Sequence, residues 1–511
     1  METKPINDAM RLTIESAFYQ NNVETLASIS DAYTMALHAE DTIVTDLDVY
    51  QAETLGLPQG AKVLVNNHGS IVGRTARARQ ILGDASDEGI IELIQDVIAK
   101  NSFCDFVRAN ASVGLHESFT MNASLMIPKK YVNNAYNFLL NFNPVRVTNP
   151  LEELFLYVDP DWSSEKYPDG LVVLDPISHT GIVLGLKYFG EIKKGILSLA
   201  WNIAHRRGYI SCHGGLKVLN GTAIAAFGLS GSGKSTLTLH DHKDEDTVAV
   251  LHDDAFVISS DFNRAIALEP SYFDKTSDMK EGSDAIKYLT TVQNNGVTLD
   301  ANGKRILVTE DRRNKNGRCI KSYFATPNRV NHVDQPLDAL LWIMKDASLP
   351  PLVKVNSATL ASSMGATLMT TRSNAENASD EGQVVIEPYA NPFRIYPLCE
   401  DYEKFKALFD TGETACYIVN TGYFDGKKVT PQVSLSLLEG IANNTLEFKS
   451  LSTDVCLEYA VVDGYEPNLE DEHYLEAIEK SFAKRVDYVA TLPEDNALPD
   501  EVRESFAINF R

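Results

Sequence analysis

The residues best suited to do chemistry form a glycine-rich stretch near the middle of the chain, FGLSGSGKST at 227–236. It fits the pattern G-x-x-x-x-G-K-[ST] in full, with Gly228, Gly233, Lys234 and Ser235 at the defining positions. Glycines let backbone N–H groups wrap phosphates, the lysine neutralises the outer phosphates, and the serine hydroxyl can ligate Mg²⁺. We therefore predict a loop that binds a nucleoside triphosphate and Mg²⁺ for phosphoryl transfer.

Two carboxylates follow this loop after a short apolar run at 248–251, which is typical of a buried strand. Asp253 and Asp254 close the run, and Asp254 follows Lys234 by 20 residues, so only a short helix fits between them. Such a strand can deliver both carboxylates beside the phosphate loop, where they are suited to a metal ion. The whole loop is a candidate nucleotide site: Gly228, Leu229, Ser230, Gly231, Ser232, Gly233, Lys234, Ser235 and Thr236.

The flanking pattern supplies elements that can position these residues. The run 222–227 predicts a strand, Lys234 can begin a helix, and Asn220-Gly221 predicts a tight hairpin turn before that strand. An apolar stripe from Ile192 to Ile203 predicts a helix that ends by Gly208. Further predictions are strands at 63–65, 151–158, 171–174 and 209–212, helices at 25–39 and 474–488, and a largely helical first 55 residues.

Composition limits the classes of function. The chain has 511 residues, of which 44% are hydrophobic and 23% charged, so we expect a globular protein of two or three domains. Its formal net charge of -24 disfavours nucleic acid and membrane surfaces as partners, because both are anionic. An anionic substrate therefore needs a local basic pocket.

The cysteine pattern and the N-terminal segment bear on the compartment. Six scattered cysteines without a C-x-x-C pair predict reduced thiols rather than a disulfide framework or a zinc site. The first residues lack the apolar core of a signal peptide, and no stretch has the uncharged length of a membrane span. We expect a cytoplasmic protein.

Several segments together resemble one known family. They are YFGEIKKG at 188–195, SCH at 211–213, the loop at 228–235 and the aspartate pair at 253–254. In this order and spacing they are similar to Y-x-G-E-x-K-K-G, S-M-H, G-L-S-G-T-G-K-T and G-D-D of ATP-dependent phosphoenolpyruvate carboxykinase. Further similar segments extend the resemblance almost from end to end: GRTAR at 73–77, NGRCIKSY at 316–323 and VNTGYFDGKKV at 419–429.

The resemblance implies a bilobal α/β fold of mixed α+β character. We expect an N-terminal mixed-sheet domain on the substrate side at 1–208. A C-terminal domain at 209–511 is expected to contain the phosphate loop and to bind nucleotide and metal. A mobile lid is expected within 361–383, which spans a polar, acidic stretch. The implied partner is a small-molecule acid, in a monomer or small homo-oligomer.

The resemblance also implies a role for particular residues. Lys194, His213 and Asp254 would hold a second divalent metal, usually Mn²⁺, with Asp253 nearby and Ser235 on the first metal. A lysine can ligate a metal only as the neutral amine, and the adjacent metal and Lys193 would both depress its pKa. The remaining residues are implied to face the acid (Arg74, Tyr188, Arg318), to lie between the acid and the phosphates (Ser230), to lie near the phosphates (Glu269, Lys275), or to pack on adenosine (Lys428 or Val429).

The implied reaction decarboxylates oxaloacetate and phosphorylates the resulting enolate with ATP, giving phosphoenolpyruvate, CO₂ and ADP. Two arginines can clamp a dicarboxylate by paired hydrogen bonds, which suits this substrate. The chain departs from the family around the nucleotide: residues 255–258 are AFVI instead of E-H-G-W, and His252 replaces a glycine. Two alternatives therefore stay open, a small-molecule kinase acting on a hydroxyl of an acidic metabolite or polyol, and a non-catalytic nucleotide sensor.

Overall fold

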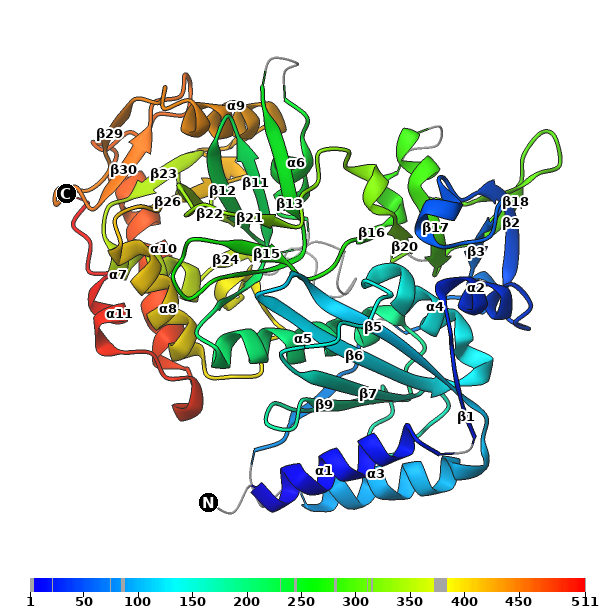
Figure 1. The fold of residues 1–511 in the computed structure, drawn as a ribbon. Coiled ribbons are helices and arrows are strands. Elements are labelled where there is room, and N and C mark those ends of the chain that lie inside the picture. The colour runs from blue at the N-terminus through cyan, green and yellow to red at the C-terminus, as the bar shows by residue number, and fades with distance from the viewer. Residues whose placement is uncertain are drawn as a thin grey trace. The chain divides into compact units, whose positions relative to one another are not determined.

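A computed structural model of the protein describes residues 4–20, 22–73, 75–83, 88–229, 231–242, 246–279, 283–309, 311–313, 316–371 and 384–510. The chain folds into two compact units. The N-terminal unit comprises Met1–Ile203 and Leu268–Pro327, and the C-terminal unit comprises Ala204–Ala267 and Asn328–Arg511. Figure 1 traces the elements of each unit along the chain.

The N-terminal unit is built on a seven-stranded sheet of order β1-β5-β6-β7-β9-β8-β4. Strand β6 pairs antiparallel with β5 and parallel with β7, so the sheet is mixed, as predicted. Its strands are β1 (Val23–Thr25), β4 (Ala78–Ile81), β5 (Phe106–His116), β6 (Phe119–Pro128), β7 (Glu153–Asp159), β8 (Leu171–Asp175) and β9 (Thr180–Leu184).

Helices cover both faces of this sheet. Met10 of α1 and Ile94 of α3 share one buried core with Phe155 of the sheet. Helix α5 covers the other face. It packs closely there, because a Cβ added at Gly195 of α5 would lie 3.5 Å from the side chain of Leu156. The helices of this unit are α1 (Lys4–Ala17), α2 (Ile29–Leu37), α3 (Glu88–Lys100), α4 (Val132–Asn141) and most of α5 (Phe189–Arg206).

A second sheet explains why a later part of the chain returns to the N-terminal unit. Its order is β16-β20-β17-β3-β2, and Thr291 of β17 pairs with Leu64 of β3. The expected domain boundary at 208 lies close to Ile203, where the chain first leaves the N-terminal unit. Residues 268–327 belong to the N-terminal unit as well, because of this pairing. The strands are β2 (Ile43–Asp48), β3 (Lys62–Val65), β16 (Tyr272–Lys275), β17 (Leu289–Gln293) and β20 (Arg318–Lys321), beside the pair β18 (Val297–Leu299) and β19 (Arg305–Leu307).

The C-terminal unit is built on an eight-stranded sheet of order β13-β11-β12-β22-β26-β23-β30-β29. Strands β12, β22 and β26 run parallel at its centre. Its strands are β11 (Gly215–Leu219), β12 (Thr222–Phe227), β13 (Val248–His252), β22 (Ala339–Met344), β23 (Leu352–Val355), β26 (Ala415–Asn420), β29 (Phe448–Ser450) and β30 (Leu457–Ala460).

Helices pack on both faces of this sheet as well. Leu237 of α6 and Leu437 of α9 share a core with Leu341 of β22, whereas Trp342 packs edge-on against Phe405 of α8. The helices are α6 (Lys234–Leu239), α7 (Ala358–Ala366), α8 (Leu398–Asp410), α9 (Pro431–Ala442), α10 (Glu472–Ala490) and α11 (Asp500–Glu504).

A four-stranded sheet of order β10-β14-β15-β21 completes the unit with two short hairpins. The hairpins are β24–β25 and β27–β28. The strands are β10 (Ile210–His213), β14 (Ala255–Ile258), β15 (Ala265–Ala267), β21 (His332–Val333), β24 (Met369–Thr371), β25 (Val384–Ile386), β27 (Tyr423–Phe424) and β28 (Lys427–Lys428).

Most local predictions are confirmed. Asn220 and Gly221 have positive φ of 52° and 85°, as the predicted tight turn between β11 and β12 requires. The helix predicted at 25–39 is wrong at its start, because Val23–Thr25 pairs with β5 and Ser28 then caps α2. The largely helical first 55 residues are also wrong, since Ile43–Asp48 is a strand paired with β3.

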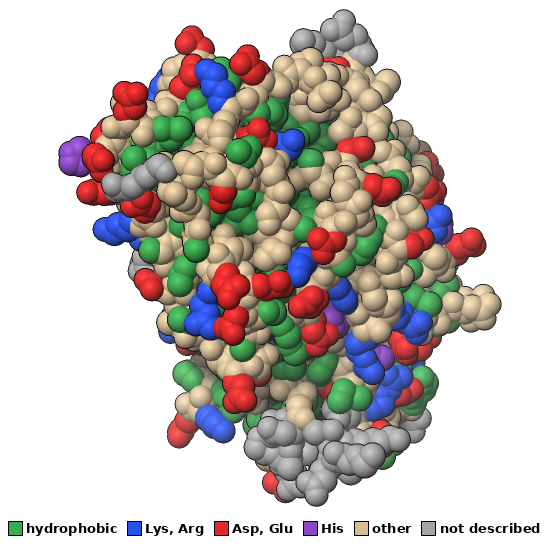
Figure 2. All heavy atoms as spheres, turned by 90° about the vertical axis from the view of Figure 1, so that its left-hand side faces the viewer, with side chains coloured by type: hydrophobic (Ala, Val, Ile, Leu, Met, Phe, Trp, Pro, Cys, Tyr) green, Lys and Arg blue, Asp and Glu red, His purple; other side chains and the backbone are tan. Residues whose placement is uncertain are grey.

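The surface agrees with the acidic composition. Figure 2 shows Asp and Glu side chains spread over the visible face, with Lys and Arg side chains between them. All six cysteines lie in the described residues and are free thiols. Among the described residues, no helix combines the length and apolar character that crossing a membrane requires.

Candidate active site

The glycine-rich loop connects β12 to α6, as predicted. Gly231 and Gly233 have φ of 81° and 102°, in the left-handed region that other residues rarely adopt. A Cβ at Gly228 would collide with Ser232 Oγ, so close approach also requires glycine there. The Ser232 N–H donates to the carbonyl of the buried Leu229 at 3.0 Å. These residues give the loop a tight turn with little side-chain bulk, which suits a phosphate chain.

The side chains that follow the loop point to the next strand and to solvent. Lys234 Nζ donates a hydrogen bond to the backbone carbonyl of Asp253. Ser235 and Thr236 are exposed in the first turn of α6, so their hydroxyls are accessible. Strand β13 therefore ends beside the phosphate loop within the C-terminal unit.

Thr421, after β26, fixes the position of the loop. Its Oγ1 donates to the carbonyl of Ser232 at 2.6 Å, and its N–H donates to the carbonyl of Met344 at 3.0 Å. A residue larger than glycine at Gly233 would approach Thr421, because a Cβ there would lie 3.5 Å from Cγ2. Sequence reasoning assigned Thr421 no role, since nothing in its spacing points to a residue 189 positions away.

His213 and Asp254 form a second polar pair in the C-terminal unit. Their Nε2 and Oδ1 atoms are 2.9 Å apart. Two neighbouring ligands of an octahedral ion at about 2.1 Å are about 3 Å apart, so both atoms can ligate one cation. His213 Nδ1 lies 2.5 Å from the Ala390 carbonyl oxygen. A proton on Nδ1 donates to this carbonyl, and the lone pair of Nε2 is then available to a metal ion. The donor set fits a divalent metal ion.

Strand pairing brings these two residues together. His213 ends β10 and lies opposite Ala255 of β14. Asp254 directly precedes Ala255 in the chain, so this register brings Asp254 beside His213. The Gly214 N–H donates to the Asp254 carbonyl at 3.1 Å and extends this pairing by one residue. The ring of Phe393 packs edge-on against His213 with centroids 5.5 Å apart. The histidine is therefore held from both sides.

Tyr188, predicted to face the acid, is buried in the N-terminal unit just before α5. Its ring lies over Gly190, where a Cβ would collide with the ring atoms. Phe273 packs against the same ring with centroids 6.1 Å apart. The glycine of the YFGE segment is therefore required by the packing of the tyrosine.

The two lysines of α5 have different surroundings. Lys194 is half-buried, with its ammonium 5.6 Å from the centroid of the Trp201 ring. Lys193 is 1% exposed and its Nζ lies 2.9 Å from Oε1 of Glu269, which is 0% exposed. Asn141 Nδ2 donates to the other oxygen of Glu269 at 2.5 Å. Lys193 and Glu269 thus bind each other, and the predicted position of Glu269 at the phosphates stays a prediction.

Lys275 and Arg318 are cross-strand partners. Lys275 ends β16, Arg318 begins β20, and the antiparallel register places them directly opposite each other. Arg318 Nε donates to Asn316 Oδ1 at 3.1 Å. Like charges at opposed positions destabilise a sheet, so the pair is suited to share an anion. The structure therefore brings together two residues that were predicted from separate segments.

Comparison with known proteins identifies the family of the chain. A sequence profile of the phosphoenolpyruvate carboxykinase family matches residues 78–467, more than half of the chain. The chain belongs to the phosphoenolpyruvate carboxykinase family. Membership confirms the predicted family and the mixed α/β fold class, and it supports the prediction of an ATP-dependent carboxykinase.

Individual relatives carry the same name. The phosphoenolpyruvate carboxykinase (ATP) of Aeropyrum pernix is 26% identical over 464 residues, covering 85% of this chain and 91% of its own length. The glycosomal phosphoenolpyruvate carboxykinases (ATP) of Trypanosoma brucei brucei and Trypanosoma cruzi are each 23% identical, covering 62% of this chain and 71% of their own lengths.

One departure from the carboxykinase pattern has a structural explanation. His252 stands where the family segment has a glycine, and its ring is fully buried. Its Nδ1 accepts the N–H groups of Asp254 at 3.0 Å and Ala255 at 3.2 Å. The ring therefore fixes the turn that carries Asp253 and Asp254.

The remaining predicted positions are described only in part. Val429 is 2% exposed and packs in a small core, whereas Lys428 is exposed, so of the two only Lys428 is accessible to a ligand. Arg74 and Ser230 lie outside the described residues. Of the expected lid at 361–383, the described part ends helix α7 and forms β24, and 372–383 lie outside it.

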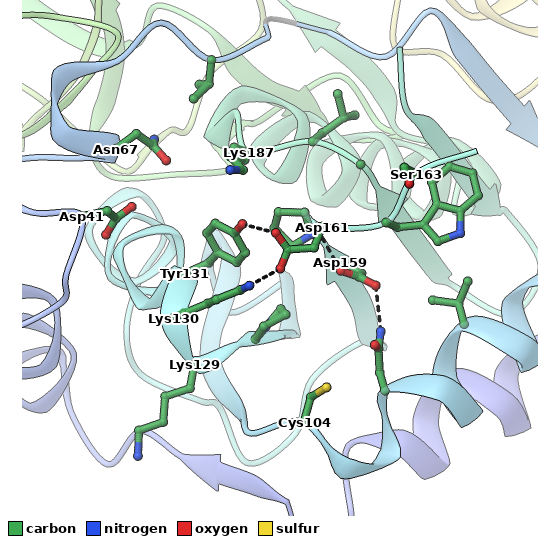
Figure 3. A pocket seen from close by; sticks show the side chains of 18 of the residues that line it. Asp41, Asn67, Cys104, Lys129, Lys130, Tyr131, Asp159, Asp161, Ser163 and Lys187 are labelled. Atoms are coloured by element: carbon green, nitrogen blue, oxygen red, sulfur yellow. Dashed lines mark hydrogen bonds and ion pairs between the residues drawn. The ribbon is translucent and has the colours of Figure 1, made fainter. Parts of the chain in front are cut away.

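A broad hollow of about 1800 Å³ lies in the N-terminal unit. Figure 3 shows Lys130 and Tyr131 reaching the same carboxylate, Asp161, at 2.5 Å each. Lys129 is paired with Glu24 at 2.7 Å. None of the predicted site residues that the structure describes lines this hollow, and these lysines are already matched by acids. It therefore adds nothing to the carboxykinase site.

Proposed function

We propose that the protein is an ATP-dependent phosphoenolpyruvate carboxykinase that converts oxaloacetate and ATP to phosphoenolpyruvate, CO₂ and ADP. The observation that carries this proposal is the contact between Lys234 of the phosphate loop and the Asp253 carbonyl. It joins the nucleotide loop to the segment that holds the His213–Asp254 pair. A phosphate site next to a metal-ligand pair is the arrangement that phosphorylation of an enolate needs.

On the nucleotide side, the loop from 228 to 236 is proposed to wrap the phosphates of ATP. Lys234 would neutralise the outer phosphates, and Ser235 with Asp253 would hold Mg²⁺. The exposed hydroxyl of Ser235 supports this role. Lys428 is proposed to contact the adenosine, where it cannot stack as an arginine would.

A second metal ion, Mn²⁺, is proposed at Lys194, His213 and Asp254. When bound there, it would act as a Lewis acid that stabilises negative charge on the oxygen of the enolate. Lys194 would have to supply its neutral amine to ligate the ion. Because Lys193 is buried against Glu269, we assign it a positioning role rather than contact with substrate.

On the acid side, Arg74, Arg318 and Tyr188 are proposed to bind the carboxylates of oxaloacetate, with Ser230 between the acid and the phosphates. The opposed pair of Lys275 and Arg318 supports an anion at the end of β20. Paired hydrogen bonds from arginine orient a carboxylate and supply the local positive charge that this acidic protein otherwise lacks.

The chemistry has two stages. The bond between the C3 methylene and the C4 carboxylate breaks, CO₂ leaves, and the electron pair forms the enolate with its charge on the C2 oxygen. That oxygen then attacks the γ-phosphorus of ATP, and ADP leaves with the electrons of the broken P–O bond. Water would protonate the enolate, so we propose that the segment 361–383 closes over the site.

The roles of the two parts of the chain follow from these assignments. The first 208 residues contribute mainly to the acid side, and 209–511 mainly to nucleotide and metal. We further propose a cytoplasmic monomer or small homo-oligomer, with small molecules and neither nucleic acid nor membrane as its partners.

Purified protein incubated with oxaloacetate, ATP and Mn²⁺ tests this activity. We expect phosphoenolpyruvate and ADP to form in equal amounts, and Lys194→Ala to reduce the rate at least about a hundredfold. Formation of neither product above the rate of Lys194→Ala would refute the proposal.

Metal binding gives an independent readout. Titration of Mn²⁺ followed by electron paramagnetic resonance should show binding weakened about tenfold or more in His213→Gln and Asp254→Asn. His332→Gln is a matched control, because His332 pairs with Asp334 at 3.2 Å in the same unit. Equal Mn²⁺ affinity in all three variants would remove this metal site from the proposal.

A small-molecule kinase is a second candidate, favoured by one observation. Residues 255–258 form the buried strand β14, so their side chains offer the nucleotide no polar group where the family has E-H-G-W. ADP release measured against hydroxy acids and polyols discriminates the two. A preferred alcohol with no turnover of oxaloacetate would replace the carboxykinase proposal.

A further inference from the structure

Lys345 emerges from the sheet at the same edge as the phosphate loop. It follows Met344, the last residue of β22, which lies between β12 and β26 in parallel pairing. Phe227, the last residue of β12, pairs with Trp342, and Met344 pairs with Asn420, the last residue of β26. Because the carboxyl ends of parallel strands meet at one edge, Lys345 leaves the sheet beside the start of the loop.

The bonds around Lys345 reach the loop itself. The carbonyl of Met344 accepts the Thr421 N–H, and the hydroxyl of Thr421 donates to the Ser232 carbonyl inside the loop. Gly422 lies directly against Lys345, since a Cβ there would be 3.3 Å from Lys345 Cβ. Met344 and Thr421 are the two residues that connect the loop to the sheet. Lys345 directly follows Met344 and lies against Gly422, the residue after Thr421.

The charge of Lys345 is not balanced within the described part of the chain. The side chain is half-buried, yet among the described residues no carboxylate pairs with its Nζ and no oxygen accepts a hydrogen bond from it. Burial lowers the pKa of Lys345 below its ordinary value, and the nearby Lys428 ammonium lowers it further. Both effects disfavour the ammonium form, so placing this lysine here costs stability in the nucleotide-free protein.

Another lysine of the same unit shows the usual arrangement. Lys217 is 2% exposed, and its Nζ donates to the carbonyls of Leu237 and His240 at 2.9 Å each. These two carbonyl groups at the C-terminal end of α6 thus stabilise the ammonium charge of Lys217. Lys345 has no equivalent partner among the described residues and instead lies near a second cation. Two such ammonium groups at the edge of a phosphate loop are suited to an anion that arrives with a ligand.

We propose that Lys345 binds the non-transferred phosphates of the nucleotide held by the loop at 228–235. This role rests on the proposed nucleotide-binding function and deepens it. The ligand chemistry is a nucleoside diphosphate group, present in both ATP and ADP. Lys234 neutralises the transferred phosphate, and Lys345 neutralises the part that remains on ADP after transfer.

Isothermal titration of the full-length protein tests this inference. Lys345→Met should weaken ADP and ATP binding by the same factor, about tenfold, because a charge-assisted hydrogen bond is lost for both. Lys345→Arg should retain most of the affinity, and adenosine, which has no phosphate, should bind the wild type and Lys345→Met equally. Lys354→Met is the matched control, since Lys354 is also half-buried but lies on β23 against Phe448.

Thermal unfolding separates a binding role from a structural one. Without nucleotide, Lys345→Met should melt at the same temperature as the wild type or higher, because it removes a charge that burial and the nearby Lys428 both disfavour. If Lys345→Met cannot be purified folded, Lys345→Gln carries the same expectations. A lower melting temperature with unchanged ADP affinity would make Lys345 a structural residue and overturn the inference.

Two other outcomes would separate this inference from the proposed function. Wild-type protein that does not bind ADP at all would refute nucleotide binding and this role together. Wild-type protein that binds ADP, with Lys345→Met equal to it, would refute the role of Lys345 alone. An unchanged ADP affinity with a raised KM for oxaloacetate would assign Lys345 to the acid and also refute it.

Discussion

Lys193 and Glu269 form an ion pair of 2.9 Å between Nζ and Oε1, with side chains only 1% and 0% exposed. The residues belong to α5 and to the segment before β16, and they join two parts of the N-terminal unit that are distant in sequence. Asn141 donates to the second carboxylate oxygen. The charge of Glu269 is thus compensated without any ligand.

Glu269→Gln should destabilise the protein by about 3–5 kcal/mol, because the buried charge of Lys193 loses its partner. Urea unfolding followed by circular dichroism measures the change. Glu466→Gln is the control, since Glu466 pairs with Lys449 at the surface and its loss should hardly change the stability. Equal midpoints for the two variants would show that the buried pair does not contribute.

Thr421→Val should weaken ADP binding about threefold to tenfold, because the hydroxyl that holds the Ser232 carbonyl is lost. Thr414→Val is matched to it, since Thr414 Oγ1 donates to the Leu337 carbonyl at 2.8 Å at the other end of the sheet. Both variants should lose similar stability, but only the first should lose affinity for ADP. The same affinity in both would contradict a positioning role for Thr421.

His252→Phe should weaken Mn²⁺ binding, since the replacement ring cannot accept the N–H groups of Asp254 and Ala255. Leaving two buried donors without acceptors should also cost about 1–3 kcal/mol each. Mn²⁺ titration and urea unfolding together measure both effects. A variant that loses stability but keeps its Mn²⁺ affinity would show that the turn is not needed to orient Asp254.

Asp401 should make the stability of the protein fall as pH rises. Burial raises the pKa of Asp401 from 3.8 to about 6, although Arg394 and Tyr396 partly oppose this. Between these values the folded state keeps a proton that the unfolded state has lost, so the free energy of unfolding decreases through pH 6. The full difference corresponds to about 3 kcal/mol.

Asp401→Asn removes this titration but keeps an oxygen that can accept the hydrogen bond from Tyr396 OH, which lies 3.1 Å from Asp401 Oδ1 in the wild type. The free energy of unfolding of the variant minus that of the wild type should therefore rise between pH 4 and pH 7. Urea unfolding at several pH values measures the difference, in which the contributions of other groups cancel. Parallel pH profiles would contradict the raised pKa.

Features that depend on neighbouring residues were predictable from the sequence. The phosphate loop, the strand and helix at its two ends and the Asn220-Gly221 turn all follow from backbone preferences of short segments. The helix at 25–39 was predicted wrongly at its start, because pairing of Val23 with Phe106 in another strand overrides local periodicity. The missed strand β2 has the same cause.

The sequence by itself determined the family, the phosphate loop and the residue types available for metal and acid. Only the tertiary structure decided which of them meet. Strand register brings Asp254 to His213 and Arg318 to Lys275, and pairing of β17 with β3 returns 268–327 to the N-terminal unit. The burial of Glu269 against Lys193 and the proximity of Lys345 to Lys428 also depend on chain segments far apart in sequence. Local preferences carry no information about such contacts, because strand pairing and core packing are set by the whole fold.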